Sequence, residues 1–311
     1  MIIRPFDWRD LPVLLRYRQR GLFLDSASIM TRGSMLVPAG ALLSYFAPAT
    51  GIYTFLCLQE NAEPLMGQVN HTQADHFARL TFIAPESAFE SPGILSLLDY
   101  LVAFIGRNGA IHLLAEVDER STAFDMLRRA GFSLYVRQRI WQLNGEKKLE
   151  AGNLWRASTV KDLIGVRSLY NTLVPALVQQ VEPQPGERLH GLVYEQNHEL
   201  LAYAEIKYGS RGVWVQPFIH PDAEAEIDHL IDMLRDLPNR RSRPVYLCVR
   251  SYQSWLEHAL EDLEAQAGPI QAVMVKHLAI AKRVTPSFAM PSLESGHHEA
   301  TAPFIRSEGK R

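Results

Sequence analysis

Two pairs of side chains capable of proton transfer stand at the ends of predicted strands. His71 and His76 flank a predicted turn between two strands, and Glu116 and Asp118 close the strand that starts at residue 112. A histidine or a carboxylate in such a position can accept a proton from an ammonium group, directly or through water. We therefore take Glu116 and His71 as candidate catalytic residues. Both residue types are also common in polar loops and at solvated strand ends, and the sequence leaves that interpretation open.

The sequence lacks the common motifs of other catalytic classes. It has no G-x-x-x-x-G-K-[ST] loop, no G-x-G-x-x-G after a strand, no G-x-S-x-G and no H-E-x-x-H. Its two cysteines, Cys57 and Cys248, lie inside apolar runs rather than in a C-x-x-C pair. This placement predicts buried thiols and no metal site.

Residues 111–143 form the segment that must position Glu116. They read as a strand, a short helix and a second strand, because Phe124, Leu127 and Ala130 have helical spacing between two β-favouring runs. Gly131 follows where the end of a helix needs a left-handed residue, a conformation that glycine adopts at little cost. A strand, helix and strand within about thirty residues predict an α/β domain.

The pattern of the first half of the chain returns in the second half. Arg4 and Asp10 recur as Arg156 and Asp162, and the hairpin sequence ENAEPL recurs as EQNHELL. The strand end IAPE recurs as IHPD, and the strand HLLAEV recurs as YLCVRS. Four matches in the same order predict a duplicated domain.

The duplication divides the chain into four predicted parts. They are an N-terminal domain (1–144), a polar linker (145–153), a C-terminal domain (154–284) and a flexible tail rich in Pro, Ser, Glu and Gly (285–311). In the C-terminal domain we predict a helix over residues 254–267 that ends at Gly268.

Residues 123–132 resemble a segment of the GNAT acyltransferases that is written N-x-x-A-x-x-L-Y-x-x-x-G-F. Ala123, Gly131 and Phe132 match it, and Met126 replaces Leu at similar volume. The resemblance implies an α/β fold of two tandem GNAT-like domains, each a mixed, mostly antiparallel sheet flanked by helices. It also implies acetyl-CoA as co-substrate and an amine acceptor, either a small molecule or a peptide.

Two positions depart from the GNAT segment. Arg120 stands at the Asn position and Leu127 at the Tyr position. In this family the Tyr often protonates the leaving thiolate of coenzyme A, and a Leu has no proton to give. The resemblance therefore implies the fold more directly than the chemistry.

The same resemblance places coenzyme A after the strand end at Ile83 and Ala84. GNAT enzymes hold the pyrophosphate on a glycine-rich loop at a helix N-terminus, where free N–H groups and the helix dipole attract anions. Ser87, Ser91 and Gly93 follow in this position, in a loop with one glycine and no basic residue. The second copy of this loop has no glycine and three acids. The N-terminal domain is therefore the expected cofactor site, with the backbone of Ile83 beside the pantetheine.

These patterns predict an acyl-CoA-dependent N-acyltransferase with acetyl as the acyl group. The alternative is a catalytically inactive protein that kept the fold for binding or scaffolding, with or without coenzyme A. The 311 residues are 47% hydrophobic and 21% charged with a formal net charge of −2, which is typical of a globular protein. We expect no nucleic-acid partner, no membrane span and a cytoplasmic location. A homodimer through exposed sheet edges stays open.

Overall fold

The structure is a computed structural model and describes residues 1–278 except 61, 73–74, 144–154, 187, 236 and 238–241. The predicted linker 145–153 and tail 285–311 lie outside the described residues. We call residues 1–143 the N-terminal half and residues 155–278 the C-terminal half.

The N-terminal half alternates strands and helices much as the sequence predicts. Its strands are β1 (Ile2–Pro5), β2 (Leu22–Phe23), β3 (Ile52–Leu58), β4 (Leu65–Asn70), β5 (Phe77–Ala84), β6 (His112–Asp118) and β7 (Ser133–Leu143). Its helices are α1 (Leu11–Tyr17), α2 (Ser26–Arg32), α3 (Leu36–Phe46), α4 (Gly93–Arg107) and α5 (Thr122–Arg129), with the 3₁₀ helix η3 (Glu86–Glu90) before α4. The predicted strand, helix and strand of residues 111–143 are confirmed.

The C-terminal half repeats this alternation with fewer elements at its start. Its strands are β8 (Trp155–Ala157), β9 (Gly191–Gln196), β10 (Glu199–Tyr208), β11 (Val213–Ile219), β12 (Val245–Arg250) and β13 (Gln266–His277). Its helices are α6 (Leu163–Leu173), α7 (Ala176–Gln179), α8 (Ile227–Arg235) and α9 (Leu256–Asp262). The helix predicted to end at Gly268 is wrong at its end. Glu264 takes the left-handed conformation with φ 57°, and Gly268 lies inside β13.

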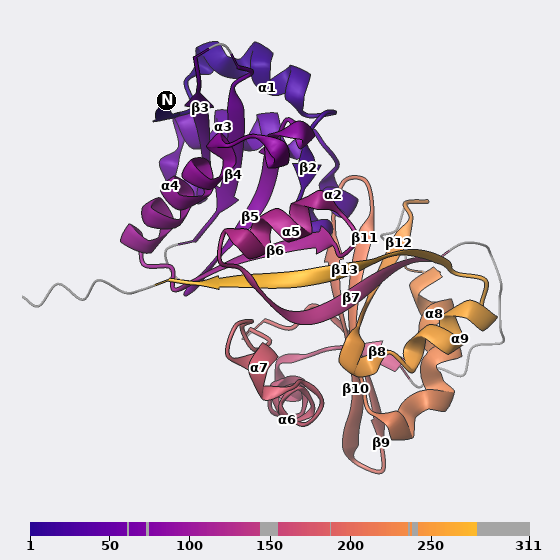
Figure 1. Cartoon of the computed structure of the whole chain (residues 1–311). Coiled ribbons are helices and arrows are strands. Elements are labelled where there is room, and N and C mark those ends of the chain that lie inside the picture. The colour runs from indigo at the N-terminus through magenta and orange to yellow at the C-terminus, as the bar shows by residue number, and fades with distance from the viewer. Residues whose placement is uncertain are drawn as a thin grey trace, which may run out of the picture. The chain divides into compact units, whose positions relative to one another are not determined.

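One mixed sheet of thirteen strands joins both halves within the described residues (Figure 1). Its strands follow the order β1-β3-β4-β5-β6-β13-β7-β12-β11-β10-β9-β8, and β2 pairs with β5. Neighbouring strands are antiparallel except β5 with β6 and β11 with β12. The predicted mixed, mostly antiparallel pairing is confirmed, but one sheet runs through both halves instead of a separate sheet in each.

The last strand of each half lies among the strands of the other half. β13 lies between β6 and β7, and β7 lies between β13 and β12. Figure 1 shows the gold β13 running beside the magenta β7. Where the two exchanged strands pair, Gln138 of β7 faces Gln271 of β13. Backbone hydrogen bonds of adjacent strands therefore join the two halves.

The Arg–Asp pair of the sequence repeat has the same geometry in both halves. Arg4 makes hydrogen bonds of 2.6 and 2.7 Å to Asp10, and Arg156 makes hydrogen bonds of 2.8 and 2.7 Å to Asp162. Each aspartate also accepts a backbone N–H three residues before it, which caps the first helical turn. A matching pair thus fixes β1 and β8 to the helix that follows.

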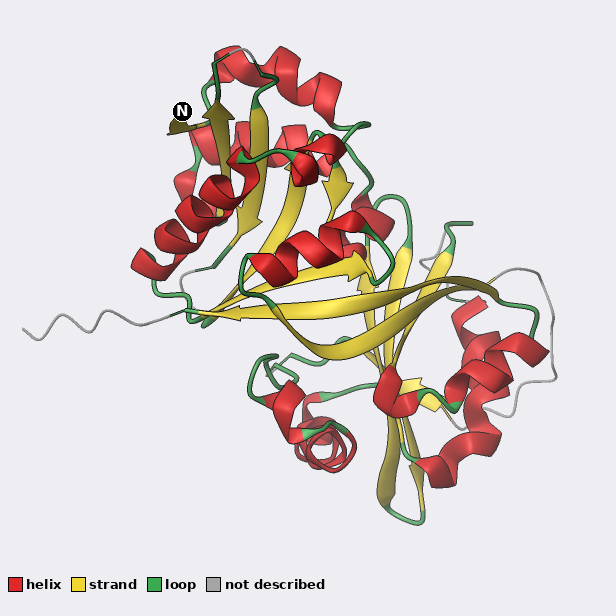
Figure 2. Cartoon of the chain, viewed as in Figure 1, coloured by secondary structure: helices red, strands yellow, loops and turns green. Residues whose placement is uncertain are grey.

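Helices cover both faces of the sheet in each half (Figure 2). In the N-terminal half α4 and α5 pack around Ile83 on one face, and α1 and α3 pack around Phe82 on the other. The two side chains are neighbours on β5, so they point to opposite faces. In the C-terminal half α8 with α9 and α6 with α7 form two separate cores in the same way.

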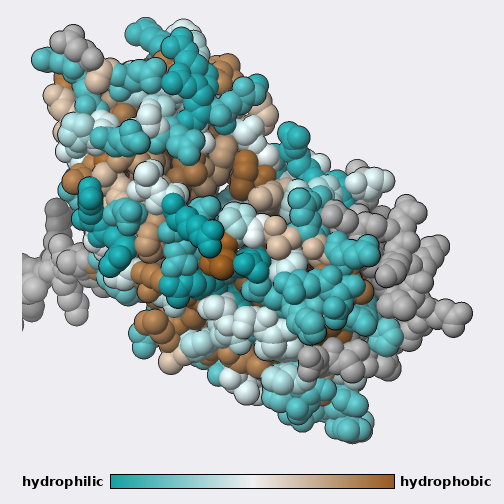
Figure 3. Space-filling model, turned by 45° about the vertical axis from the view of Figure 1, so that its right-hand side comes forward, coloured by the Kyte–Doolittle hydropathy of each residue, from teal (hydrophilic) through white to brown (hydrophobic). Residues whose placement is uncertain are grey.

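The surface shown in Figure 3 is largely hydrophilic, with apolar side chains in small groups. Among the described residues, no helix is both long enough and apolar enough to cross a membrane.

Candidate functional site

β5 and β6 run together for three residues and then separate. Their parallel pairs join Phe77–Arg79 to residues 112–114. Beyond these pairs, residues 22–24 lie between the two strands. Leu22 and Phe23 of β2 pair antiparallel with residues 83 and 82 of β5. We call this gap between residues 80–84 of β5 and 115–118 of β6 the slot.

Leu24 makes a backbone hydrogen bond to each wall of the slot. Its N–H donates to the carbonyl of Thr81 on β5 (3.0 Å), and its carbonyl accepts the N–H of Glu116 on β6 (2.9 Å). Thr81 is an extra residue of β5 relative to β4, since Gln68 pairs with residue 82 and the next β4 residue pairs with residue 80. Such a β-bulge bends the strand and changes the direction in which its backbone N–H and carbonyl groups point. The slot therefore already holds an extended amide chain bonded on both sides.

Glu116 belongs to the β6 wall of this slot and is 5% exposed. Its carboxylate accepts the backbone N–H of Ser26 (2.9 Å) and the side-chain amide of Gln138 (3.0 Å), and it lies 3.5 Å from Arg79. Gln138 in turn donates to Gln271 (2.8 Å). The predicted catalytic carboxylate is therefore held by three donors from α2, β7 and β5.

His71 lies in a different environment from Glu116. It is 2% exposed, and its ring nitrogens lie 3.3 Å from the carbonyl of Phe77 and 3.1 Å from the carbonyl of Asn108. These contacts connect the end of β4 to the start of β5 and to the end of α4. His71 lines neither of the cavities discussed next. The structure does not bring the two predicted catalytic residues together.

A polar cavity of about 500 Å³ lies between the two halves, and we call it the central cavity. Glu116 and Arg79 line it from the N-terminal half, and Tyr170, Glu182 and Arg250 line it from the C-terminal half. Its position places the predicted carboxylate at a site that both halves build.

Arg250 is the most buried cation of the central cavity, at 4% exposed. Its guanidinium lies 2.9 Å from Glu182, which also accepts the hydroxyl of Tyr135 (2.6 Å). Burial opposes the charged form, but Glu182 raises the pKa of Arg250 well above its ordinary value. Burial and Glu182 also raise the pKa of Tyr170 to about 12. Both side chains therefore keep their protons, and can donate them in hydrogen bonds, at neutral pH.

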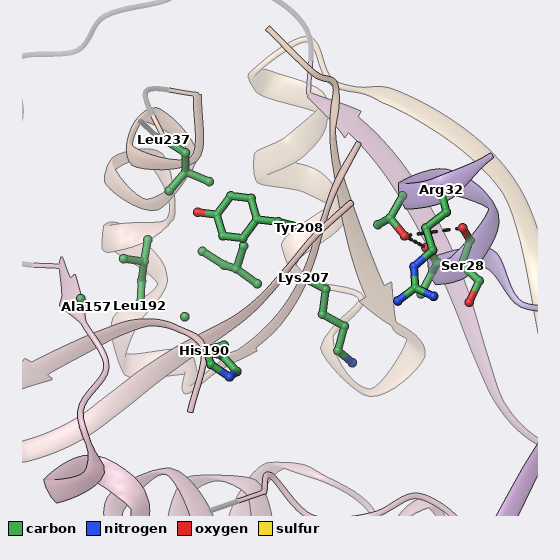
Figure 4. Close-up of a pocket in the computed structure, with 12 residues that line it drawn as sticks. Ser28, Arg32, Ala157, His190, Leu192, Lys207, Tyr208 and Leu237 are labelled. Carbon is green, nitrogen blue, oxygen red and sulfur yellow. Dashed lines mark hydrogen bonds between the residues drawn. The ribbon is translucent and has the colours of Figure 1, made fainter. Parts of the chain in front are cut away.

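A larger cavity of about 670 Å³ lies between α2 and the start of β9. Figure 4 shows Leu192, Tyr208 and Leu237 at one side of it and Ser28 and Arg32 of α2 at the other. No group of three or more His, Cys, Asp or Glu in the described part of the chain could hold a metal ion. The described residues that line the larger cavity include no Asp or Glu, so unlike the central cavity it offers no carboxylate as a proton acceptor.

Comparisons with solved structures identify the fold. A GCN5-related N-acetyltransferase from Sphaerobacter thermophilus is 11% identical with a TM-score of 0.53, over 89% of this chain and 95% of that chain. A tandem GNAT protein from the clavulanic acid biosynthesis pathway is 12% identical with a TM-score of 0.50, over 89% of this chain and 98% of that chain. The chain has a GNAT fold. No family model matches the sequence, and no curated protein matches it.

In the N-terminal half, the residues predicted to hold coenzyme A are engaged by other parts of the chain. Ile83 and Ala84 are fully buried, and β5 is paired there with β4 on one side and β2 on the other. A side chain at Gly93 would meet Gln59, whose amide lies 3.4 Å from the hydroxyl of Ser91. Ser87 is exposed. As arranged, the amide of Gln59 therefore occupies the space beside Ser91 and Gly93 that the resemblance assigns to the pyrophosphate.

In the C-terminal half, β11 and β12 also separate after three parallel pairs. There the buried side chain of Gln253 donates to the carbonyl of Ile219 (3.1 Å). Pro217 lies in the diverging part of β11 and offers no N–H. In the C-terminal half, an incoming amide chain would therefore find no N–H at Pro217 and would find the carbonyl of Ile219 already bonded to Gln253.

Sequence reasoning missed Arg250, Tyr170 and Glu182 as residues of a site. Arg250 ends the apolar run VYLCV. A cation at the end of a buried strand is a usable signal, because a buried charge needs a partner of opposite charge. Tyr170 and Glu182 gave no such signal, because ordinary amphipathic helices and loops contain the same residue types.

Proposed function

We propose that this protein is an acyl-CoA-dependent N-acyltransferase with acetyl as the acyl group. The slot between β5 and β6 would take the donor, and the central cavity would take a small-molecule or peptide amine. The observation that supports this proposal is the extended amide chain already bonded in the slot. Pantetheine is also an extended amide chain, so the slot has a suitable width and suitable hydrogen-bonding groups.

Donor binding in this proposal requires residues 22–24 to leave the slot. The carbonyl of Thr81 and the N–H of Glu116 would then be free for the incoming chain. Gln59 would move from Gly93, and Ser91 with the nearby N–H groups would face the pyrophosphate. When bound, acyl-CoA supplies an acyl group activated as a thioester. The protein contributes position and a proton acceptor, which is Glu116 or a water beside it.

A second candidate function is binding without catalysis. The pairing of β2 with β5 supports it directly, because a strand that stays in the slot excludes the donor. Leu127 supports it as well, because it leaves the position of the GNAT tyrosine without a proton donor. In this case the protein binds its ligand in the central cavity alone.

Thermal unfolding with and without acetyl-CoA separates the two candidates. A ligand at 100 times its dissociation constant adds about 2.7 kcal/mol to stability. The enzyme interpretation expects such a shift, together with release of free thiol when an amine is added. No shift at millimolar acetyl-CoA refutes it, and a shift without thiol release across an amine panel supports binding alone.

The variant Glu116→Gln tests the proton acceptor. It keeps the side-chain size and, according to the proposal, lowers the acyl transfer rate by about 10²-fold or more while acetyl-CoA still binds. Glu119→Gln is the matched control, because Glu119 pairs with Arg137 at the surface (2.6 Å) and lies outside the central cavity. Equal rates in both variants would remove Glu116 from the proposal.

A further inference from the structure

The two walls of the central cavity carry different charge. The N-terminal wall has Asp25, Asp75 and Glu116 against the single cation Arg79. The C-terminal wall has two acids and two cations, which are Glu182, Glu205, Lys207 and Arg250. The N-terminal wall is therefore net negative by two charges and attracts a cationic group, whereas the C-terminal wall is balanced.

Most carboxylates of the central cavity already have partners in the chain. Asp25 accepts from the N–H and the hydroxyl of Ser28 at the start of α2. Glu116 has its three donors, Glu182 has Tyr135 and Arg250, and Glu205 lies 3.2 Å from Lys207. The exception among the described residues is Asp75, whose side chain is half-buried and has no described partner.

The cavity residues that lack partners at buried atoms are donors on the C-terminal wall. Nε and Nη1 of Arg250 have no hydrogen-bond partner among the described residues, and neither does the hydroxyl of Tyr170. Both residues are more than nine-tenths buried. A buried donor without an acceptor destabilises the fold, and the cost is larger for a charged group. These donors therefore predict a ligand that carries a hydrogen-bond acceptor, and an anionic acceptor makes the strongest hydrogen bonds to a guanidinium.

We propose that the central cavity binds a compact amine that carries a carboxylate. The carboxylate would accept from Arg250 and Tyr170 on the C-terminal wall, and the ammonium group would lie toward Asp75 and Glu116 on the N-terminal wall. A volume of about 500 Å³ limits the ligand to a small molecule or the end of a peptide. This inference rests on the proposed function only where it names the acceptor class, because the binding itself needs no acyl donor.

Binding is tested by calorimetry on the full chain without acetyl-CoA. The probes are glycine, β-alanine, 4-aminobutyrate, 6-aminohexanoate and glycylglycine, with butylamine and butyrate as single-charge controls for 4-aminobutyrate. The proposal expects at least one amino acid probe to bind at least tenfold tighter than either control, which corresponds to about 1.4 kcal/mol. The proposal is overturned if no amino acid probe binds at 10 mM, or if a single-charge control binds as tightly as the best of them.

The variant Tyr170→Phe tests the anion contact with little risk to folding, because it removes a hydroxyl that has no hydrogen-bond partner among the described residues. It should leave the unfolding temperature equal or higher. It should also weaken binding of the best probe about tenfold, which corresponds to about 1.4 kcal/mol of binding free energy. Tyr17→Phe is the control, since Tyr17 donates to the carbonyl of Pro64 (2.9 Å) outside the cavity. That control should lower stability and leave probe affinity unchanged.

Unchanged probe affinity in Tyr170→Phe would overturn the assigned anion contact. Because these measurements contain no acyl donor, a failure of acyl transfer leaves their result intact. Conversely, an enzyme that acylates amines but binds none of these probes would retain the proposed function and lose this inference.

Discussion

Gly21→Ala should release β2 from the slot. A Cβ atom at Gly21 would lie 2.3 Å from the ring of Phe82, which is fully buried on β5. The ring has no free space to move into, so the loop before β2 must move away from β5. If acetyl-CoA and residues 22–24 compete for the slot, this destabilisation of β2 should strengthen acetyl-CoA binding.

The size of the effect follows from the contacts of the segment. Residues 24–26 make three hydrogen bonds to the slot walls, which are Leu24 to Thr81, Glu116 to Leu24 and Ser26 to the Glu116 carboxylate. At about 1 kcal/mol each, these three bonds contribute about 3 kcal/mol to the filled slot, in addition to the pairing of Leu22 and Phe23 with β5. Overpacking at Gly21 should cost about 1–3 kcal/mol of this preference. Since apparent affinity scales with the fraction of open slot, Kd should fall about tenfold for about 1.4 kcal/mol.

The assay is a titration of acetyl-CoA with the wild type, Gly21→Ala and a matched control. Gly67→Ala is the control, because Gly67 lies on β4 at the other side of β5 and a Cβ there would meet Leu101 at 2.8 Å. Both variants should unfold at lower temperature, but only Gly21→Ala should bind acetyl-CoA more tightly. If both variants bind equally or more weakly than the wild type, competition between β2 and the donor is refuted.

Two further predictions concern stability and reactivity. The hydrogen bonds from Arg4 and Arg156 lower the pKa values of Asp10 and Asp162 in the folded chain, so the stability from these pairs is present above the unfolded pKa of about 3.9. This stability is lost as the pH falls from that value toward the folded pKa values. The double variant Asp10→Asn with Asp162→Asn should therefore make the urea midpoint of unfolding depend less on pH between about pH 4 and pH 2. The same pH dependence in the double variant and the wild type would contradict the pairing. Burial raises the pKa of Cys248 to about 12, and Cys57 and Cys248 are both fully buried, so neither thiol should react with Ellman's reagent at pH 8 before unfolding. A thiol that reacts within seconds in the folded protein would contradict this burial.

The sequence alone predicts the features that depend on short stretches of chain. The repeat of Arg4 and Asp10 as Arg156 and Asp162 marks the same capping arrangement twice, because six residues contain the whole interaction. Gly131 has φ 85° as its position after a helix predicts.

Features that depend on distant partners were not predicted. Leu22 and Phe23 are two ordinary apolar residues, and nothing beside them indicates that they pair with β5 some sixty residues later. The partners of β7 are equally hidden, because its alternating pattern fits β6 and β12 alike. The cavity donors Arg250 and Tyr170 come together only through these pairings, so local pattern gave no candidate site there.

The exchange of β7 and β13 has a consequence for how this protein can change over time. If the chain were cut at the linker and the halves separated, the N-terminal half would lose β13 from between β6 and β7. The C-terminal half would lose β7 from between β13 and β12. Each half would then have unpaired strand edges. A copy that loses its own ligand therefore cannot be discarded, since its partner is built partly from it. One copy can therefore acquire substitutions that change its ligand or its reaction, while both copies remain in the same chain.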